Sequence, residues 1–423
     1  MRASSIEEIS SASDQQHVHA ELDFIRACIG NERAEKSRES QVVLDHIRPK
    51  VLYSSLPFGT ILCSEYHPDE PDLTRIIHSF RDIILSYRQQ ENLSINRALQ
   101  GLVERGVFRA FTTPEEEAIA KQCIFSAVGI ASRLYSPTPV QRQGHFEINT
   151  QGARCFTRNA VDINLSARPI DELLRALGQI LPRADWRMPT NDDPRQPSVK
   201  FCVSSLNADV LKNLANVHII WVNSIAAHLE FDPIVTALYL FRLPSFCKLH
   251  NTGDSILSTL TKEFYLDQES PVPRFSIQDF LNEIMLSYGL LFAHDVRSRK
   301  LYRQEERCRA KINDEVDVDP LLDQLCGMDI STSMFSFTGP VRETYDASTD
   351  FPIFNERLSA IQGYISGIQP GRLKSLWRDR RDLRLWYTIW AVLIIGGISI
   401  ILAMVQVILS AAQVALAKQA LGP

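Results

Sequence analysis

The sequence lacks the features that mark secreted scaffolds and nucleic-acid-binding proteins. Its eight cysteines are spread over 423 residues without a CxxC pair. This spread excludes a disulfide-stapled secreted scaffold and favours thiols in a reducing compartment. The net charge is −5 and the pI is about 6.1, so no global positive field draws the chain onto nucleic acid, and no nucleic-acid partner is expected.

Motifs that carry well-understood catalytic chemistry are missing as well. The chain has no GxxxxGK[ST] phosphate loop, no GxGxxG after a strand, no GxSxG elbow, no HExxH and no protein-kinase signature. These absences favour a non-enzymatic protein without a cofactor. Hydrophobic residues make up 45% of the chain and charged residues 22%, which excludes collagen-like, coiled-coil and wholly disordered chains.

One polar cluster has a weak similarity to a metal site. His228 and Glu230 are followed by Cys247 and, three residues later, by His250. Thiolate and imidazole are zinc ligands, but no second pair completes a four-ligand shell. His228 lies among apolar residues and Cys247 follows Phe246, as core residues do. The sequence therefore favours no bound metal and leaves His228, Cys247 and His250 as the candidate ligands.

What the chain does have is one long apolar run near its C-terminal end. No charged residue occurs in Leu385–Ala417, and a membrane-spanning helix needs about 20 such residues. The sequence predicts one transmembrane helix over 385–417 and a short tail over 418–423. Cations and aromatic rings at its near end are the predicted interface anchors. These anchors are Arg380, Arg381, Arg384, Trp386, Tyr387 and Trp390.

The flanks of this run predict its orientation. Six cations precede it between Arg372 and Arg384, and only Lys418 follows it. The positive-inside rule then places the N-terminal region in the cytosol. The N-terminus is polar and predicts no signal peptide, so we expect a single-pass, tail-anchored protein. The length and apolar character of the span favour the endoplasmic reticulum over the mitochondrial outer membrane.

Small and polar residues recur within the span at alternating spacings of three and four. This spacing places them on one helix face, where small side chains allow close approach and amides bond across helices. The face predicts either self-association or association with a partner span, and chance placement is the alternative. The seam residues are Gly396, Ser399, Ala403, Gln406, Ser410, Gln413 and Ala417.

The rest of the chain predicts a mainly α fold with a small α/β insert at about 199–246. Apolar residues recur at helical spacing after Asp72, Ser94, Thr113 and Ser276, each of which is a candidate N-cap. Branched and aromatic residues at 217–222 and 237–241 predict strands. The predicted divisions are a disordered segment 1–16, a helical region 17–136, a region 137–328 that holds the insert, a linker 329–352 and an amphipathic, basic juxtamembrane helix 353–384.

Two stretches resemble known sequences. One comprises Leu206–Ala208, His218–Val222, His228–Asp232 and Leu240–Cys247; the other comprises Ser287–Phe292, Asp295, Arg297–Lys300 and Leu321–Cys326. With the tryptophan-rich span, they are similar to a group of uncharacterised filamentous-fungal proteins with a single C-terminal membrane span. The resemblance covers about residues 199–417. It implies a fungal source and one span, and it carries no activity, cofactor or catalytic residue.

These observations lead to one expected function and two alternatives. We expect a membrane-tethered adaptor that binds the lipid bilayer, a cytosolic protein partner and, through the seam, a second span. One alternative is a membrane-anchored enzyme of an unrecognised family. The other is a sensor of anionic lipids, for which the basic run 297–311 and the juxtamembrane segment 372–384 offer cations. An acidic run follows at 314–323 and favours mutual neutralisation instead.

Overall fold

The computed structural model describes residues 2–30, 37–68, 70–139, 141–182, 199–264, 275–311, 317–328, 342–368 and 383–420. Most of these residues are helical, so the predicted mainly α class is confirmed. Helices of the N-terminal half are α1 (Arg2–Ile29), α2 (Arg38–Phe58), α3 (Asp72–Gln89), α4 (Ile95–Glu104), α5 (Pro114–Ser132) and α6 (Ile170–Leu177). Later helices are α7 (Pro244–His250), α8 (Ile256–Thr261), α9 (Ile277–Tyr288), α10 (Val296–Leu301), α11 (Arg307–Ala310), α12 (Pro320–Leu325), α13 (Asn355–Gly367) and α15 (Leu383–Ala420).

Helix α1 differs from the prediction for the N-terminus. The sequence predicts disorder over 1–16, but the helix begins at Arg2 and includes that segment. Its 28 residues contain neither glycine nor proline, so nothing interrupts the backbone hydrogen bonds. The helix ends at Gly30, whose φ of 73° is the left-handed conformation that glycine adopts most readily.

Side-chain caps start several helices where the sequence predicts them. Ser94 accepts a hydrogen bond from the backbone of Arg97 at the start of α4. Thr113 does the same for α5, where Pro114 occupies the first turn. Ser276 and Asp279 form a reciprocal capping box at α9. Each cap satisfies a backbone donor that the helix itself leaves unpaired.

Three small sheets interrupt the helices. The central one has the order β4 (His218–Val222), β6 (Ala237–Phe241) and β5 (Phe231–Asp232). β6 pairs in parallel with β4 and antiparallel with β5. The two-stranded sheets pair β1 (His145–Glu147) with β2 (Ala160–Asp162) and β3 (Lys200–Cys202) with β7 (Thr344–Asp346). The predicted α/β insert therefore contains a short parallel pair of strands.

Strand β7 corrects the prediction of a linker at 329–352. The described part of this segment begins at 342, pairs with β3 and buries Tyr345 and Phe351. Phe351 packs against Phe201 at a ring-centroid distance of 6.1 Å. These contacts are made across about 150 residues of chain, which is why the serine- and threonine-rich local sequence does not predict them.

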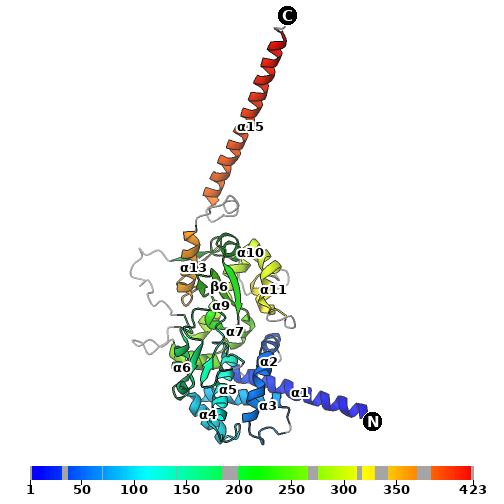
Figure 1. Cartoon of the computed structure of the whole chain (residues 1–423), viewed down its shortest axis with the longest axis vertical. Coiled ribbons are helices and arrows are strands. Elements are labelled where there is room, and N and C mark those ends of the chain that lie inside the picture. The colour runs from blue at the N-terminus through cyan, green and yellow to red at the C-terminus, as the bar shows by residue number, and fades with distance from the viewer. Residues whose placement is uncertain are drawn as a thin grey trace.

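The buried apolar residues from Ala20 to Ile365 form one cluster. α3 packs against α1 and α8, and α2 packs against α7 and α5. Figure 1 shows α1 to α6 at one end of this folded region and the β4–β6–β5 sheet with α10, α11 and α13 at the other. We use "folded region" below for α1 through α13. Both predicted regions, 17–136 and 137–328, contribute to the one core.

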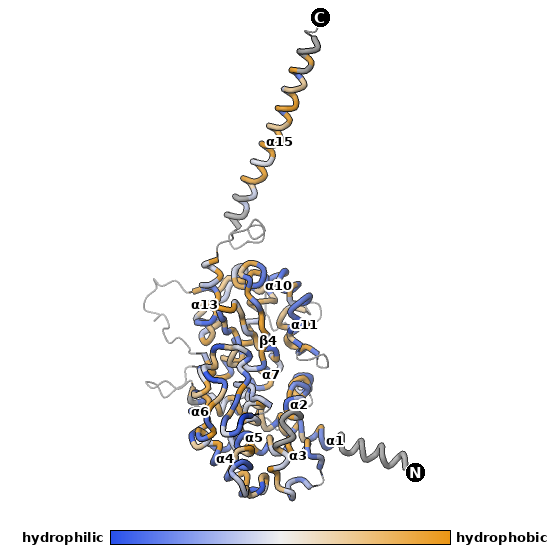
Figure 2. Tube along the Cα trace, viewed as in Figure 1, coloured by the Kyte–Doolittle hydropathy of each residue, from blue (hydrophilic) through white to orange (hydrophobic). Residues whose placement is uncertain are grey.

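Helix α15 extends away from the folded region (Figure 1). It begins close to the predicted residue 385 and continues to Ala420. Its segment Trp390–Val414 is long and apolar enough to cross a membrane, and none of that segment is buried by the protein. Figure 2 shows the resulting hydrophobic stretch along a single helix. The juxtamembrane helix predicted at 353–384 is α13 as far as Gly367, and 369–382 lie outside the described residues.

Candidate functional site

His228, the first predicted metal ligand, has both ring nitrogens bonded to the protein. Nδ1 accepts the backbone N–H of Phe241 at 3.2 Å, and Nε2 lies 2.8 Å from Ser287 Oγ. The ring proton is therefore on Nε2 and is donated to Ser287, whose hydroxyl in turn donates to the Ile284 carbonyl. Burial, aided by the charge of Arg357, lowers the pKa of His228 well below its usual value. A proton on Nε2 is the wrong state for activating Ser287 as a nucleophile.

Cys247 and His250 lie on the buried face of α7. The pKa of Cys247 is raised well above its usual value by burial and by the charge of Asp319, so the thiol stays protonated. The His250 ring stacks on Phe246 at 4.0 Å. Glu230 lies beside the thiol of Cys155 instead. Among the described residues, the group whose ligand atoms lie close enough to share an ion is a different one.

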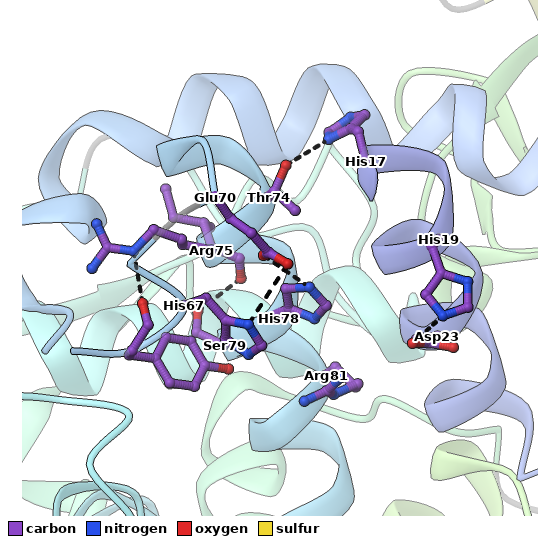
Figure 3. Close-up of polar contacts among 12 residues, drawn as sticks. His17, His19, Asp23, His67, Glu70, Thr74, Arg75, His78, Ser79 and Arg81 are labelled. Atoms are coloured by element: carbon purple, nitrogen blue, oxygen red, sulfur yellow. Dashed lines mark hydrogen bonds and ion pairs between the residues drawn. The ribbon is translucent and has the colours of Figure 1, made fainter. Parts of the chain in front are cut away.

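This other group is His67, Glu70 and His78, whose ligand atoms all lie within 4.8 Å of one another. His78 Nε2 is 3.1 Å from Glu70 Oε2, and His67 Nδ1 is 3.7 Å from Glu70 Oε1. The two imidazole rings are stacked, with centroids 4.3 Å apart and planes 9° apart. Figure 3 shows the Glu70 carboxylate at the edge of the stacked pair, paired with both rings. We call this set the histidine–glutamate cluster.

The loop that carries His67 and Glu70 is fixed against α3. Arg75, on the first turn of α3, donates to the carbonyls of Cys63 and Tyr66. The Tyr66 hydroxyl donates to Asp82 at 2.8 Å. His67 itself has a φ of 47°, a left-handed conformation that is uncommon for any residue except glycine. The loop therefore holds His67 over His78, which projects from α3 (Figure 3).

The electrostatics of the cluster leave lone pairs available. Burial lowers the pKa of His78, with the opposing effect of Glu70 and further lowering by His67 and Arg81. His78 Nδ1 is buried and has no hydrogen-bond partner, whereas Nε2 of the same ring faces Glu70 Oε2. Two imidazoles and one carboxylate form the ligand set of many catalytic zinc sites. The spacing His67-x-x-Glu70 with His78 eight residues on is a weak sequence signal, and only the fold of the loop brings the three together.

The seam residues all lie on helix α15. Ser399 donates its hydroxyl to the carbonyl of Ile395 at 2.8 Å, so this hydroxyl already has a partner in its own helix. The side chains of Gln406, Ser410 and Gln413 are exposed. Among the anchors, Tyr387 is exposed and Trp390 is partly buried. Arg380 and Arg381 lie outside the described residues, as do the side chains of Arg384, Trp386 and Ala417.

The basic run 297–311 makes contacts within the protein. Arg307 bonds both oxygens of Asp323 at 2.9 to 3.1 Å. Arg299 donates to the carbonyl of Ala293 at 2.5 Å, and Arg303 Nε lies 3.4 Å from the Met328 sulfur. Mutual neutralisation, as predicted from the adjacent acidic run, describes Arg307 and Asp323. Lys300 of the same run is exposed, and the lipid-sensor alternative stays a prediction.

Comparisons of the chain with protein-family models, curated proteins and solved structures gave no match. The resemblance to fungal membrane proteins therefore stays a prediction. Function has to be argued from the chemistry of the sites themselves.

Proposed function

We propose that this chain is a membrane-tethered protein whose folded region binds a protein partner at the membrane surface. The observation that carries the proposal is the exposure of α15. Isoleucine, leucine and valine side chains between 392 and 416 are about half exposed or more. A helix that is apolar on every side is stable only when lipid or protein covers it, because water does not solvate so large an apolar surface.

The dimensions fit a single crossing. Trp390–Val414 has 25 residues and is about 37 Å long at the helical rise of about 1.5 Å per residue. The hydrocarbon core is about 30 Å thick, and a modest tilt accommodates the difference. Cations before α15 and the lone Lys418 at its far end support a cytosolic folded region. Long apolar spans favour the endoplasmic reticulum.

A binding role is supported by the state of the buried reactive groups. His228 holds its proton on the nitrogen that faces Ser287, so it cannot take up the serine proton. The Cys247 thiol is neutral. Burial also raises the pKa of the Cys123 and Cys28 thiols, which keeps them in the unreactive form. These buried groups stabilise the core and are not in a reactive state, which favours a binding role for the folded region.

Tethering is tested by placing charge in the middle of the span. Ile394→Arg with Ile401→Arg adds about 3 kcal/mol per residue to the free energy of insertion. We expect the full chain to remain with membranes after alkaline extraction and the double variant to appear in the soluble fraction. Ile394→Val with Ile401→Val is the matched control and should remain with membranes. Retention of the arginine variant would show that α15 is not the tether.

Partner binding is tested by mass spectrometry of proteins that co-purify after mild solubilisation. One form carries α15 and the other carries an unrelated membrane helix after residue 382. We expect a near-stoichiometric partner with both forms, because the folded region makes the contact. A partner lost on exchange of the helix would place recognition in the membrane. The absence of any partner with either form would overturn the adaptor proposal.

The histidine–glutamate cluster supports a second candidate function, that of a membrane-anchored metal-dependent hydrolytic enzyme. His67, Glu70 and His78 would hold a zinc ion, which supplies an activated water when it is bound. The stacked rings have to rotate apart for their in-plane lone pairs to converge on one ion. The test is the zinc content of the full chain after exposure to zinc and dialysis. We expect one equivalent in the wild type and in His19→Gln, and none in His78→Gln.

A further inference from the structure

Five basic side chains come from α2, α5, α7 and the end of β6, and they lie close enough for the charge of Arg133 to act on His46, Lys50 and His250. They are His46 and Lys50 on α2, Arg133 at the C-terminal cap of α5, Arg242 directly after β6, and His250 at the end of α7. Two backbone hydrogen bonds join the arginines to the segment from Val222 to Ile225. Ile225 N donates to the Arg133 carbonyl at 2.9 Å, and Arg242 N donates to the Val222 carbonyl at 3.1 Å. We call these five residues the basic cluster.

The cluster lies at the carboxyl end of the parallel strands. Val222 is the last residue of β4, and Arg242 follows the last residue of its parallel neighbour β6. Ligands of sheets with parallel strands bind at this end, where the following loops diverge. α2 packs against both α5 and α7, and the charges of Arg133 and Arg242 act on its His46 and Lys50.

Arg242 donates Nη1 to the Lys311 carbonyl at 2.8 Å and Nη2 to the Trp221 carbonyl, but other groups of the cluster have no partner. Arg133 is 2% exposed, yet its Nε and Nη2 atoms make no hydrogen bond. Arg242 Nε and His250 Nδ1 are also buried without a partner. No ion pair joins any of the five residues to a carboxylate in the part of the chain that the structure describes. A buried guanidinium without a counter-charge is strongly unfavourable, so a negative group is missing from this place.

The backbone at Arg133 adds a second unfavourable feature. Its φ of 55° is left-handed, at a helix cap where glycine is the usual residue. The chain therefore holds a long charged side chain at a position that disfavours any side chain, and directs it into the interior. A purely structural cap would need neither the charge nor the strain.

The mutual repulsion of the cluster is visible in its proton affinities. Burial, with the charge of Arg242, lowers the pKa of Arg133 to about 10. Burial, with Arg133 and Arg242, lowers the pKa of His46 to about 4, and burial with Arg133 lowers that of His250 to about 3. The pKa of Lys50 is lowered well below its usual value by the same causes. The basic cluster therefore has positive charge without a negative partner.

We propose that the basic cluster binds a dianionic phosphoryl group, held by Arg133 and Arg242 with Lys50 beside them. The unpaired Nε and Nη2 donors of Arg133 match two oxygens of a phosphate, Arg242 adds its unpaired Nε, and Lys50 adds an amino group. His250 supplies a further N–H. A dianion balances the two guanidinium charges and satisfies their unpaired donors.

The burial of Arg133 sets the size of the ligand. A side chain that is 2% exposed is reached by a phosphate ion or the phosphate end of a small water-soluble ester. A phospholipid that stays in the bilayer does not reach it. The ligand is therefore soluble and compact, and it stabilises the packing of α2, α5 and α7 on the parallel strands.

The first experiment identifies what co-purifies with the full-length protein in detergent. The protein is denatured, the released material is divided between water and organic solvent, and both phases are analysed for phosphorus and by mass spectrometry. We expect about one phosphate group per chain in the aqueous phase from the wild type and from Arg97→Met. Arg97 lies on the exposed face of α4 and is the matched control. We expect none from Arg133→Met. Phosphorus in the organic phase alone would overturn the proposal of a soluble ligand.

The second experiment measures thermal unfolding with inorganic phosphate or chloride at equal ionic strength. A phosphate concentration a hundredfold above Kd should raise the wild-type Tm by about 4 °C relative to chloride. Because phosphate also stabilises proteins non-specifically, the comparison is with Arg133→Met, which should lose this increase and be at least as stable as the wild type in chloride. Lys50→Met should bind about tenfold more weakly. It tests the site even where Arg133→Met does not fold. Equal phosphate effects in all variants, together with no released phosphorus, would show that the basic cluster is not an anion site.

Discussion

The folded region and helix α15 place the same residue types in opposite surroundings. Ile83 of α3 is 0% exposed, whereas Ile401 of α15 is 61% exposed. The surroundings of polar side chains also differ between the two parts. Buried Glu306 has Trp221 and Lys212 as partners in the folded region, whereas Gln406 on α15 is exposed. The folded region supplies its own solvent-excluded interior, and α15 depends on a medium outside the protein. The difference shows that apolar content alone does not distinguish a core from a membrane span.

A second contrast lies inside the folded region. Glu306 is 0% exposed and bonds Trp221 at 3.2 Å, Lys212 at 2.8 Å and Arg309 at 3.0 Å. Arg133 is equally enclosed and lacks such partners. The buried charge of Glu306 is therefore compensated by the protein, whereas the Arg133 guanidinium has no carboxylate partner among the described residues.

The largest expected effect concerns a buried carboxyl group of the folded region. Glu283 accepts the backbone N–H groups of Ile353 and Phe354 at the start of α13. Burial raises its pKa from 4.5 to about 8, against the lowering effect of these two bonds. The folded protein then holds a proton between pH 4.5 and 8 that the unfolded chain has released, so stability falls as the pH rises through this window.

Denaturant unfolding from pH 5 to 8.5 measures this loss, which is at most about 5 kcal/mol. Glu283→Gln should remove most of the pH dependence and retain an acceptor for α13. Glu343→Gln, at an exposed position, should leave the dependence unchanged. A wild-type stability that stays constant over this range would contradict the raised pKa.

The next prediction compares an isoleucine of the folded region with an isoleucine of α15. Ile83→Ala removes a fully buried side chain and should lower the free energy of unfolding by about 2–5 kcal/mol. Ile401→Ala, in contrast, should change it by less than about 0.5 kcal/mol, because α15 contributes nothing to that core. Urea unfolding of the full chain in detergent measures both variants. Equal destabilisation by the two would mean that α15 packs on the folded region.

A smaller effect is expected within the membrane. Gln406→Leu with Gln413→Leu removes two amides from the seam, each worth about 0.6–2 kcal/mol when it bonds across helices. The oligomer of this double variant should dissociate at a higher protein concentration than the wild-type oligomer. Cross-linking at several protein-to-detergent ratios measures the difference. Met404→Leu with Ile408→Leu changes the opposite face and is the control. An unchanged oligomeric state in the glutamine variant would remove the basis for the seam.

The smallest expected effect is the loss of one helix cap in the folded region. Ser94→Ala removes the cap of α4 and should lower the free energy of unfolding by about 1 kcal/mol. Ser94→Asp keeps an acceptor at the same position and should retain most of the stability. Thermal unfolding of both variants measures the difference. A loss of equal size in both would assign the effect to packing and not to the cap.

Much of the local structure was predictable because its causes are local. The caps at Ser94, Thr113 and Ser276 need only a side-chain oxygen and the next backbone turn. The strands at 218–222 and 237–241 follow from branched and aromatic residues. The parallel pairing of these strands was not predictable, because the pattern of one strand carries no information about the direction of its neighbour.

The functional sites follow the same division. The sequence by itself determined the apolar helix over 385–417, since length and the absence of charge are sufficient for such a helix in any context. Tertiary structure alone brought His67 over His78, through a left-handed backbone and the Arg75 contacts with the loop. It alone joined Arg133 to Arg242 across more than a hundred residues, because burial and charge compensation depend on what surrounds a side chain in space and not on its neighbours in the chain.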